Sequence, residues 1–221
     1  MTQHIVLAGS TGLIGGHVRT RLAGHPDVGL ISLTRTGSSA PGQPVDYEQL
    51  LASPKAVLKS VAPDGVDVAI SCLGTTIAAA GSQSDMFRVD HDYVLALAEA
   101  ARAMGARQFI LVSSVGAGGI GFYLKTKGAI EKAVDGLGFT RFDIIRPGLL
   151  LGDRRDERPR EVIVQRVFTA LSPVMVGPLA RYAAIPADTV AAAIVALTNK
   201  GGAGRYLHEN ADLRALTGIG Q

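Results

Sequence analysis

Tyr123 and Lys127 are the residues of this chain whose types and spacing best suit acid–base chemistry. They stand four positions apart, which places both side chains on one face of a helix. Ser113 and Ser114 precede the tyrosine by ten and nine positions, at the end of an apolar segment. A serine hydroxyl can hold a substrate carbonyl, a phenol can transfer a proton, and an ammonium can activate the phenol. A half-exposed tyrosine and a solvated lysine on one helix would show the same spacing, so this pair alone leaves both interpretations open.

A second motif, near the start of the chain, is typical of phosphate binding. Ile5 to Ala8 form a short apolar run that suits a strand buried on both faces. Gly9, Gly12 and Gly15 follow at three-residue intervals, and an amphipathic helix begins among them. Glycine allows a tight turn and a close approach of a pyrophosphate, while the start of the helix presents unpaired N–H groups. The motif predicts a bound dinucleotide, and a glycine-rich turn without a ligand is the alternative.

Arg35 indicates which dinucleotide to expect. Residues 28–34 are predicted to form the second strand, and Arg35 follows them directly. In the NAD-binding pattern an acidic residue near this position binds the ribose 2′-hydroxyl, whereas an arginine suits a 2′-phosphate. There is no Asp or Glu between Asp27 and Asp46. We therefore expect NADP(H) to be preferred over NAD(H), with an ordinary solvated loop arginine as the alternative interpretation.

The elements that must position these residues alternate between strand and helix. Strands are predicted at 5–8, 28–34, 44–47, 66–73, 109–112 and 140–146, with helices between them, the longest from about 84 to 104. This order predicts an α/β fold with a doubly wound, mostly parallel sheet of the Rossmann type. Ligands of such sheets bind outside the carboxyl ends of the strands. Leu73 and Gly74, which end the fourth strand, are therefore candidate cofactor contacts.

The alternation of strands and helices becomes less regular beyond Leu151. Helices are predicted near 161–171, 187–198 and 211–216, with a last strand at 205–208. We expect one domain spanning residues 1–221, in which residues from about 152 to 221 form a small C-terminal cap on the substrate side. Glycines 116–121 are expected to form a mobile loop, residues 77–83 a flexible one, and His91 is expected on a solvated face.

Composition and charge narrow the functional classes. The 47% of apolar residues suits a sheet covered on both faces, and a net charge of only +3, with dispersed basic residues, argues against a nucleic-acid partner. The longest apolar runs fall well short of the roughly 20 residues of a membrane span. A single cysteine excludes an intrachain disulfide and a cysteine metal cluster, and we expect no metal. Because no basic segment or cleavage site precedes the first strand, we expect a cytoplasmic protein.

Several longer sequence motifs along the chain resemble those of a known family. They are Cys-Leu-Gly-Thr-Thr (72–76), Phe-Arg-Val-Asp-His-Asp-Tyr-Val (87–94), Tyr-Leu-Lys-Thr-Lys-Gly (123–128), Arg-Pro-Gly-Leu-Leu-Leu (146–151) and Asp-Arg-Arg-Asp-Glu-Arg-Pro (153–159). With the GxxGxxG turn, they resemble the atypical, extended-like branch of the short-chain dehydrogenase/reductase superfamily. More narrowly, the chain is similar to the Tat-interacting tumour-suppressor oxidoreductase family and its bacterial relatives. Two departures from common short-chain dehydrogenases are a fourth strand without Asn-Ala-Gly and a short gap between serine and tyrosine.

The resemblance implies specific roles for residues of this chain. It implies a monomer or weak homodimer that binds NADPH, with Tyr123 and Lys127 as the catalytic pair and Ser114, or else Ser113, completing the set. The implied cofactor contacts are Gly9, Ser10, Thr11, Gly12, Leu13, Ile14, Gly15, Arg35, Leu73, Gly74, Tyr123, Lys127, Pro147, Leu150 and Arg158.

These observations predict an NADP(H)-dependent oxidoreductase that transfers a hydride between nicotinamide and a small carbonyl compound or alcohol. Two alternatives stay open. A regulatory or scaffold protein that binds NADPH with little or no turnover fits the missing Asn-Ala-Gly and the slight cap. A flavin or quinone reductase would leave Tyr123 and Lys127 without an acid–base task. No motif names the substrate, which we expect to be a small molecule.

Overall fold

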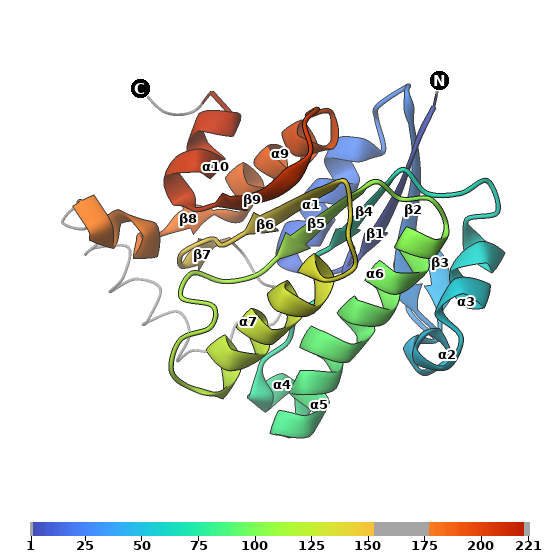
Figure 1. The fold of residues 1–221 in the computed structure, drawn as a ribbon, viewed down its shortest axis with the longest axis horizontal. Helices are drawn as coiled ribbons and strands as arrows, with labels where there is room; N and C mark the ends of the chain where they lie inside the picture. Colours follow the sequence, from blue (N-terminus) through green and yellow to red (C-terminus); the bar gives the residue numbers. More distant parts are fainter. Residues whose placement is uncertain (1, 153–176, 219–221) are drawn as a thin grey trace.

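A seven-stranded parallel sheet forms the centre of the protein (Figure 1). The computed structural model describes residues 2–152 and 177–218. The strand order is β3-β2-β1-β4-β5-β6-β9, with bounds Gln3–Ala8 for β1, Val28–Arg35 for β2, Gln43–Val45 for β3, Val68–Ser71 for β4, Gln108–Val112 for β5, Arg141–Ile145 for β6 and Gly204–His208 for β9. The strand order reverses at β1, which pairs with both β2 and β4. A reversal of this kind is where doubly wound sheets bind their ligands.

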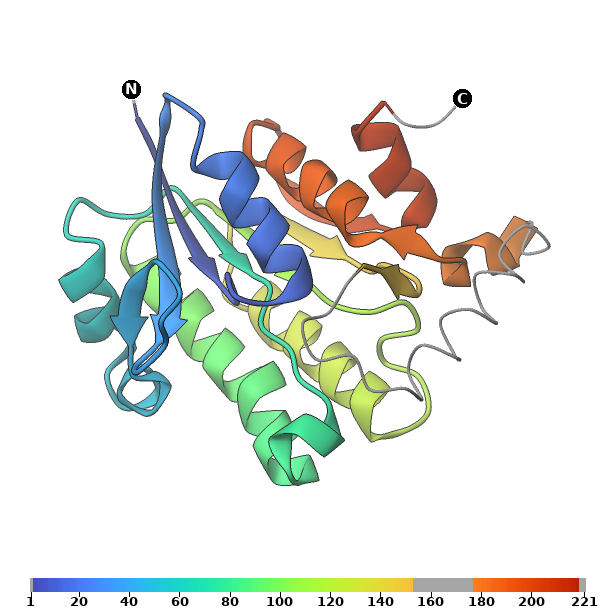
Figure 2. The same cartoon turned by 180° about the vertical axis from the view of Figure 1, so that it is seen from behind.

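Helices cover both faces of this sheet (Figures 1 and 2). On one face lie α1 (Leu13–Leu22), α9 (Ala187–Thr198) and α10 (Asn210–Leu216); on the other lie α2 (Tyr47–Ala52), α3 (Pro54–Val61), α6 (Tyr93–Ala103) and α7 (Phe122–Asp135). The remaining elements are α4 (Ile77–Ala80), α5 (Gln83–Phe87), a π-helical turn η1 (Arg88–Asp92), a 3-10 helix η3 (Gly177–Tyr182), and the short parallel pair β7 (Leu150–Leu151) and β8 (Ile185–Pro186). The predicted α/β doubly wound fold is confirmed.

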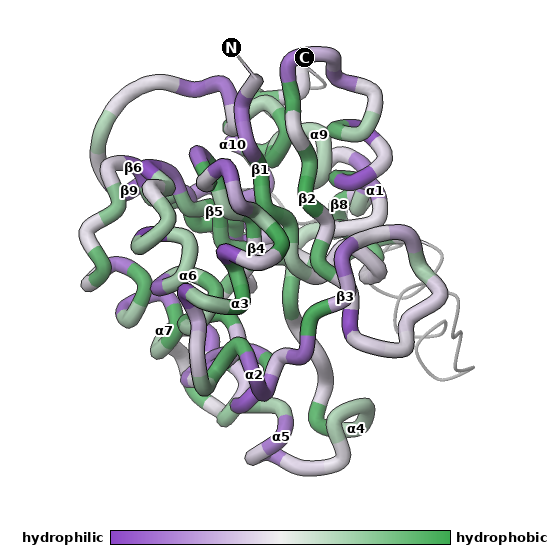
Figure 3. Tube along the Cα trace, turned by 90° about the vertical axis from the view of Figure 1, so that its right-hand side faces the viewer, coloured by the Kyte–Doolittle hydropathy of each residue, from purple (hydrophilic) through white to green (hydrophobic). Residues whose placement is uncertain are grey.

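The first strand shows why the sheet lies at the centre. Ile5 to Ala8 are completely buried. Because successive side chains of a strand point to opposite faces, Val6 and Ala8 join the core under α6, while Ile5 and Leu7 join the core under α1. Figure 3 shows hydrophobic residues along the central strands and many hydrophilic residues on the outer turns and helices. The apolar run thus forms the strand buried on both faces that its composition predicts.

The long helix predicted at about 84–104 is interrupted in the structure. It consists of α5, the π-helical turn η1 and α6 in succession. A π turn inserts an extra residue and rotates the side chains around it, which is why such turns recur at functional sites. Asp90 is the buried residue of this turn, and the His91 ring stacks on Phe87 with 4.5 Å between ring centroids. The expected solvated position of His91 is wrong, because only 16% of its side chain is exposed.

The C-terminal segment differs from the predicted cap. α9 packs against α1, and β9 pairs with β6 as the seventh strand of the main sheet. Apolar residues along α9 bury against the sheet, including Val190, Ile194 and Leu197. Residues 187–208 therefore belong to the main layers, and the prediction of a cap does not hold for them. The predicted loop at 77–83 likewise contains α4. Residues 47–61 form two helices, α2 and α3, because Ser53 divides them ahead of Pro54.

Candidate active site

The predicted site residues gather at the carboxyl edge of the sheet. Gly9 to Gly15 follow β1, Arg35 ends β2, Leu73 and Gly74 follow β4, Ser113 and Ser114 follow β5, Tyr123 and Lys127 lie in the first two turns of α7, and Pro147 and Leu150 follow β6. Parallel strands bring these segments together because all their carboxyl ends lie on one side. Arg158 lies outside the described residues.

The glycine turn between β1 and α1 is closed by backbone packing. Gly9 has a φ of +78°, and a Cβ there would lie 2.5 Å from the carbonyl carbon of Cys72. A Cβ at Gly15 would lie 2.1 Å from the carbonyl oxygen of Gly9. Gly12 is less crowded, with its nearest atom at 3.4 Å, and it caps α1 without any side-chain acceptor. The turn therefore fits tightly between α1 and the end of β4.

This turn fits the phosphate groups of a dinucleotide. Among the described residues, the N–H groups of Leu13 and Ile14 have no hydrogen-bond partner, and no side chain caps the helix. Free N–H groups at a helix start carry a partial positive charge and suit a phosphate. The Ser10 side chain faces elsewhere, since its hydroxyl donates to the carbonyl of Leu33 at 3.1 Å. Thr11 and Gly12 are exposed, which leaves this face of the turn open to a ligand.

Arg35 presents a free cation beside this turn. It is exposed, and no acidic side chain of the described residues pairs with its guanidinium. Burial raises the pKa of Tyr47 to about 12, and the nearby positive charge of Arg35 acts in the opposite direction. Arg35 pairs with Val45 of β3 where β2 ends, at the edge of the sheet, and its guanidinium is available to an anion.

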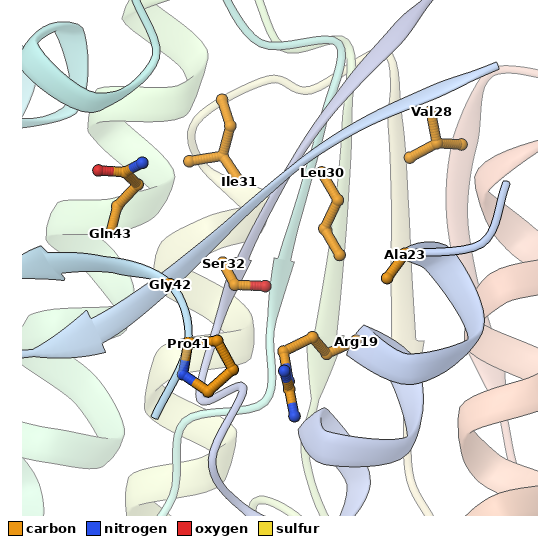
Figure 4. A pocket seen from close by; sticks show the side chains of 9 residues that line it. All are labelled: Arg19, Ala23, Val28, Leu30, Ile31, Ser32, Pro41, Gly42 and Gln43. Atoms are coloured by element: carbon orange, nitrogen blue, oxygen red, sulfur yellow. The ribbon is translucent and has the colours of Figure 1, made fainter. Parts of the chain in front are cut away.

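A hollow of about 440 Å³ lies on the α1 face of β2, away from this edge (Figure 4). It exists because a loop, with no helix, connects β2 to β3, and this part of the sheet stays uncovered. Figure 4 shows Arg19 reaching from α1 toward Pro41, over the side chains of Leu30 and Ser32. None of the predicted site residues lines this hollow.

Tyr123 and Lys127 differ sharply in exposure. Tyr123 is 40% exposed, whereas Lys127 is 4% exposed, and the lysine Nζ lies 5.9 Å from the centre of the tyrosine ring. Nζ also lies 2.8 Å from Oδ1 of the buried Asp90. A Cβ on Gly74 would lie 3.5 Å from both charged groups. The lysine is therefore held between α7, the π turn and the segment that follows β4.

Sequence reasoning missed Asp90 as a partner of this lysine. A signal was present, because Asp90 stands three residues after Phe87 and four before Val94. Those intervals put it on the apolar face of the helix. An aspartate on such a face is buried only when another group compensates its charge.

The two serines after β5 have different environments. Ser113 is buried, and its hydroxyl donates to Glu131 at 2.5 Å. Glu131 also accepts a hydrogen bond from Arg146 at 2.9 Å, and its carboxylate raises the pKa of this arginine. Ser114 is half-buried, and its hydroxyl makes only a 3.3 Å contact with the carbonyl of Val115. Ser114 is thus the serine whose hydroxyl is available to a substrate.

The segments after β5 and β6 are fixed to one another and to α7. The Val115 N–H donates to the carbonyl of the buried Pro147 at 3.1 Å. The Gly118 N–H donates to the carbonyl of Leu124, and a Cβ on Gly128 would lie 2.6 Å from the Cα of Gly118. The glycine-rich segment predicted as a mobile loop therefore packs against the start of α7.

Two further residues complete this edge. Leu150 packs against the core under α1, and a Cβ on Gly152 would lie 2.8 Å from the Leu13 side chain at the start of that helix. Burial raises the pKa of the Cys72 thiol to about 12, and the charge of Lys127 opposes the shift only in part. A thiol in this state is inert. The described residues contain no group of three or more side chains able to hold a metal ion.

Comparison with known proteins places the chain in a family. Residues 5–133 match the model of the "NAD dependent epimerase/dehydratase family". The chain belongs to this family. Protein fmp52, mitochondrial, of Emericella nidulans is 37% identical over 180 residues, which are 77% of each chain. Protein HTATIP2 of Rattus norvegicus is 45% identical over 109 residues, 48% of this chain and 45% of that protein. The predicted resemblance to extended-like short-chain dehydrogenases is confirmed.

Solved structures of epimerase-family proteins share the fold. The UDP-glucose 4-epimerase of Thermotoga maritima, solved with UDP-glucose, aligns with a TM-score of 0.69 at 16% identity over 99% of this chain and 84% of that one. The human epimerase family protein SDR39U1, solved with NADPH, aligns with a TM-score of 0.66 at 17% identity over 95% and 75%. At such identities the likeness concerns the fold alone, and the NAD(P)-binding character of the chain rests on the family.

The expected cytoplasmic location is contradicted by these relatives. Fmp52 proteins of several fungi, at 33–37% identity, are named as mitochondrial. The expectation rested on hydropathy and on the residues before the first strand, whereas the names of these relatives state a compartment. No helix of the described residues is both long and apolar enough to cross a bilayer.

Proposed function

We propose that this epimerase/dehydratase-family protein is an NADP(H)-dependent oxidoreductase that interconverts a small carbonyl compound and its alcohol. The observation that carries the proposal is the pair on α7, where the exposed phenol of Tyr123 stands beside the buried ammonium of Lys127. Both lie at the sheet edge that also carries the glycine turn. A proton donor at this edge is needed for carbonyl reduction, whereas a protein that only binds a dinucleotide has no use for it.

The chain provides groups for each part of the dinucleotide. The N–H groups at the start of α1 would hold the pyrophosphate, and Arg35 would bind the 2′-phosphate. Lys127 would hold hydroxyls of the ribose next to the nicotinamide. Leu73 and Gly74, which follow β4, and Pro147 and Leu150, which follow β6, would also contact the cofactor. The bound dinucleotide supplies the hydride.

The remaining chemistry belongs to side chains of this protein. Ser114 would donate its hydroxyl hydrogen to the carbonyl oxygen of the substrate and fix its orientation. Tyr123 would donate a proton to that oxygen as negative charge develops on it, and the tyrosinate would accept the proton in the reverse direction. The ammonium of Lys127 would stabilise the tyrosinate by Coulomb attraction. Ser113, Glu131 and Arg146 would keep the two strand ends and α7 in fixed relative positions.

A substrate screen with one conservative variant tests this proposal. Oxidation of NADPH is measured with aldehydes, ketones, quinones and flavins, for the unmodified protein and for Tyr123→Phe. We expect carbonyl turnover to fall by roughly 10²- to 10⁴-fold, the usual contribution of a general acid, with NADPH affinity retained. Tyr206→Phe is the control, since that hydroxyl only bonds the nearby carbonyl of Ala203. Turnover unaffected by Tyr123→Phe would indicate a flavin or quinone reductase, and binding without any turnover a regulatory protein.

A further inference from the structure

Asp90 is a buried carboxylate to which the proposed reaction assigns no role. Its exposed fraction is 1%, and it lies in the π-helical turn between α5 and α6. Burying an ionised carboxylate is costly unless it is paired and hydrogen-bonded. A regular α-helix would give Asp90 a different orientation, since the π turn inserts one residue into the helical repeat. The chain therefore departs from regular helix geometry at the residue that meets Lys127.

The two oxygens of Asp90 contact two different parts of the site. Oδ1 lies 2.8 Å from Nζ of Lys127 in an ion pair, and it has no hydrogen-bond partner among the described residues. Oδ2 accepts the backbone N–H of Thr75 at 2.7 Å, in the segment that follows β4. Gly74, in the same segment, lies beside both charged groups, since a Cβ there would be in ordinary contact with each at 3.5 Å. One side chain thus joins the lysine of α7 to the backbone that follows β4.

This arrangement fixes where the lysine ammonium can be. Its carboxylate partner within the described part of the chain is Asp90, since Glu131, one turn further along α7, pairs with Arg146 and Arg205. A buried ammonium without a counter-charge would move to solvent or lose its proton. The carboxylate of Asp90 compensates this buried charge, and an ammonium carries three N–H groups that can donate to a ligand.

We infer that Asp90 is a positioning residue. It holds the Lys127 ammonium and the Thr75 backbone at fixed positions next to the site of the ribose that carries the nicotinamide. The inference rests on the proposed function, because it requires that Lys127 meets this ribose. It predicts that Asp90 matters for the nicotinamide half of the dinucleotide and has no effect on the adenosine half.

Calorimetric titration with two probes distinguishes binding of the nicotinamide half of the dinucleotide from binding of the adenosine half. NADPH contains both riboses, whereas 2′,5′-ADP lacks the nicotinamide ribose. For Asp90→Asn, which keeps an acceptor for Thr75 and loses the charge, we expect NADPH affinity to fall about tenfold, because the Lys127 ammonium loses the carboxylate that positions it. Affinity for 2′,5′-ADP should be unchanged. Asp90→Leu should lose more NADPH affinity, because the Thr75 contact is also removed.

Asp92→Asn is the matched control, since Asp92 belongs to the same turn but pairs with His91 near the surface. It should leave both affinities unchanged. Unfolding temperatures of all variants show whether the fold is retained, and Asp90→Asn decides the matter if Asp90→Leu does not fold. Equal losses for both probes, or unchanged NADPH affinity in a folded Asp90→Asn, would overturn the inference while leaving the proposed function intact. An unmodified protein that does not bind NADPH would overturn both, and the expected affinity pattern without turnover on any carbonyl would overturn the proposed function alone.

Discussion

The two halves of the sheet build their parts of the site in different ways. In the glycine half, formed by β1, β2, β3 and α1, the buried polar residues are the neutral Ser10, Ser32 and Thr34. In the charged half, formed by η1, β5, α7, β6 and β9, lie all the buried charged residues of the described part of the chain: Asp90, Lys127, Glu131, Arg141 and Asp143. One half is shaped by backbone that leaves no room for a side chain, and the other by ion pairs between elements distant in sequence.

This difference has a physical reason. In the proposed function, the glycine half brings N–H groups close to phosphates, and backbone can do so only where side chains are absent. In the proposed function, the charged half holds an ammonium, a phenol and a hydroxyl at fixed positions. Buried ion pairs are weak contributors to net stability, but breaking one by removing a partner is costly. The glycine half should therefore respond to added volume and the charged half to lost charge.

The largest effect is expected from adding a methyl group in the glycine half. In Gly15→Ala the new Cβ would lie 2.1 Å from the carbonyl oxygen of Gly9. The clash cannot be relieved easily, because the Cβ is fixed to the backbone of α1 and the oxygen belongs to the backbone of the glycine turn. We expect loss of NADPH binding and a fall in the free energy of unfolding of more than about 3 kcal/mol, in the range of severe overpacking. Chemical denaturation and NADPH titration measure both quantities.

Gly16→Ala is the control for this prediction, because its Cβ would meet its nearest atom at 3.8 Å. It should be neutral, or stabilising by about 0.5–1 kcal/mol, since alanine favours a helix over glycine. If Gly15→Ala and Gly16→Ala behave alike, backbone packing does not define the glycine half.

In the charged half, the corresponding test is Glu131→Ala. The change removes the acceptor of Ser113 and leaves Arg146 without its partner. We expect the free energy of unfolding to fall by about 3 kcal/mol, as when one partner of a buried pair is removed. Glu99→Ala, on the exposed side of α6, should change it by less than about 0.5 kcal/mol. Similar urea midpoints for both variants would remove the reason for treating the charged half as distinct.

Arg35 is the side chain by which the glycine half is proposed to select its cofactor. Arg35→Asp replaces a cation with an anion where we expect the 2′-phosphate, so NADPH affinity should fall about a hundredfold, equivalent to roughly 2.7 kcal/mol. NADH lacks that phosphate, and its affinity should change by less than threefold. Fluorescence titration with both nucleotides tests the assignment, and equal effects on the two would rule it out.

A smaller effect is expected from protonating Asp143. Burial alone would raise the pKa of this carboxyl, but hydrogen bonds from His208, Arg141 and Gln108 outweigh burial and hold it below its usual value. The resulting stabilisation is present above about pH 4, the usual range of an unfolded aspartate, and is lost as the pH falls through the folded value. Asp143→Asn should therefore be less stable than the unmodified protein at pH 7, and the difference should shrink below about pH 4. Thermal unfolding at several pH values measures it, and a difference that stays constant with pH would contradict the stated cause.

The glycine half could be predicted well because its signals are local. The apolar run of β1, the glycine spacing and Arg35 after β2 all lie within 35 residues of the start. Strand ends defined in this way also predicted the edge at which Leu73 and Gly74 lie. The helix at 187–198 was predicted with its observed bounds, because its apolar pattern is continuous over three turns.

The charged half could be predicted only in part. Tyr123 and Lys127 were found from their spacing. The spacing of Asp90 indicates a buried position, but its pairing with Lys127 depends on how the π turn packs against α7. The choice between Ser113 and Ser114 depends on Glu131, which lies 18 residues from Ser113 on another element. The predicted C-terminal cap was misjudged for a similar reason, since nothing near residues 204–208 reveals that they pair with β6.

By itself, then, the sequence determined the alternating elements, the glycine turn and the residue types of the site, because short-range sterics and periodicity act between neighbours in the chain. Only the tertiary structure decided which charges meet. Asp90 with Lys127, and Glu131 with Ser113 and Arg146, join elements whose contact depends on how helices pack on the sheet. A buried charge needs a partner from elsewhere in the fold, and the position of that partner is set by packing.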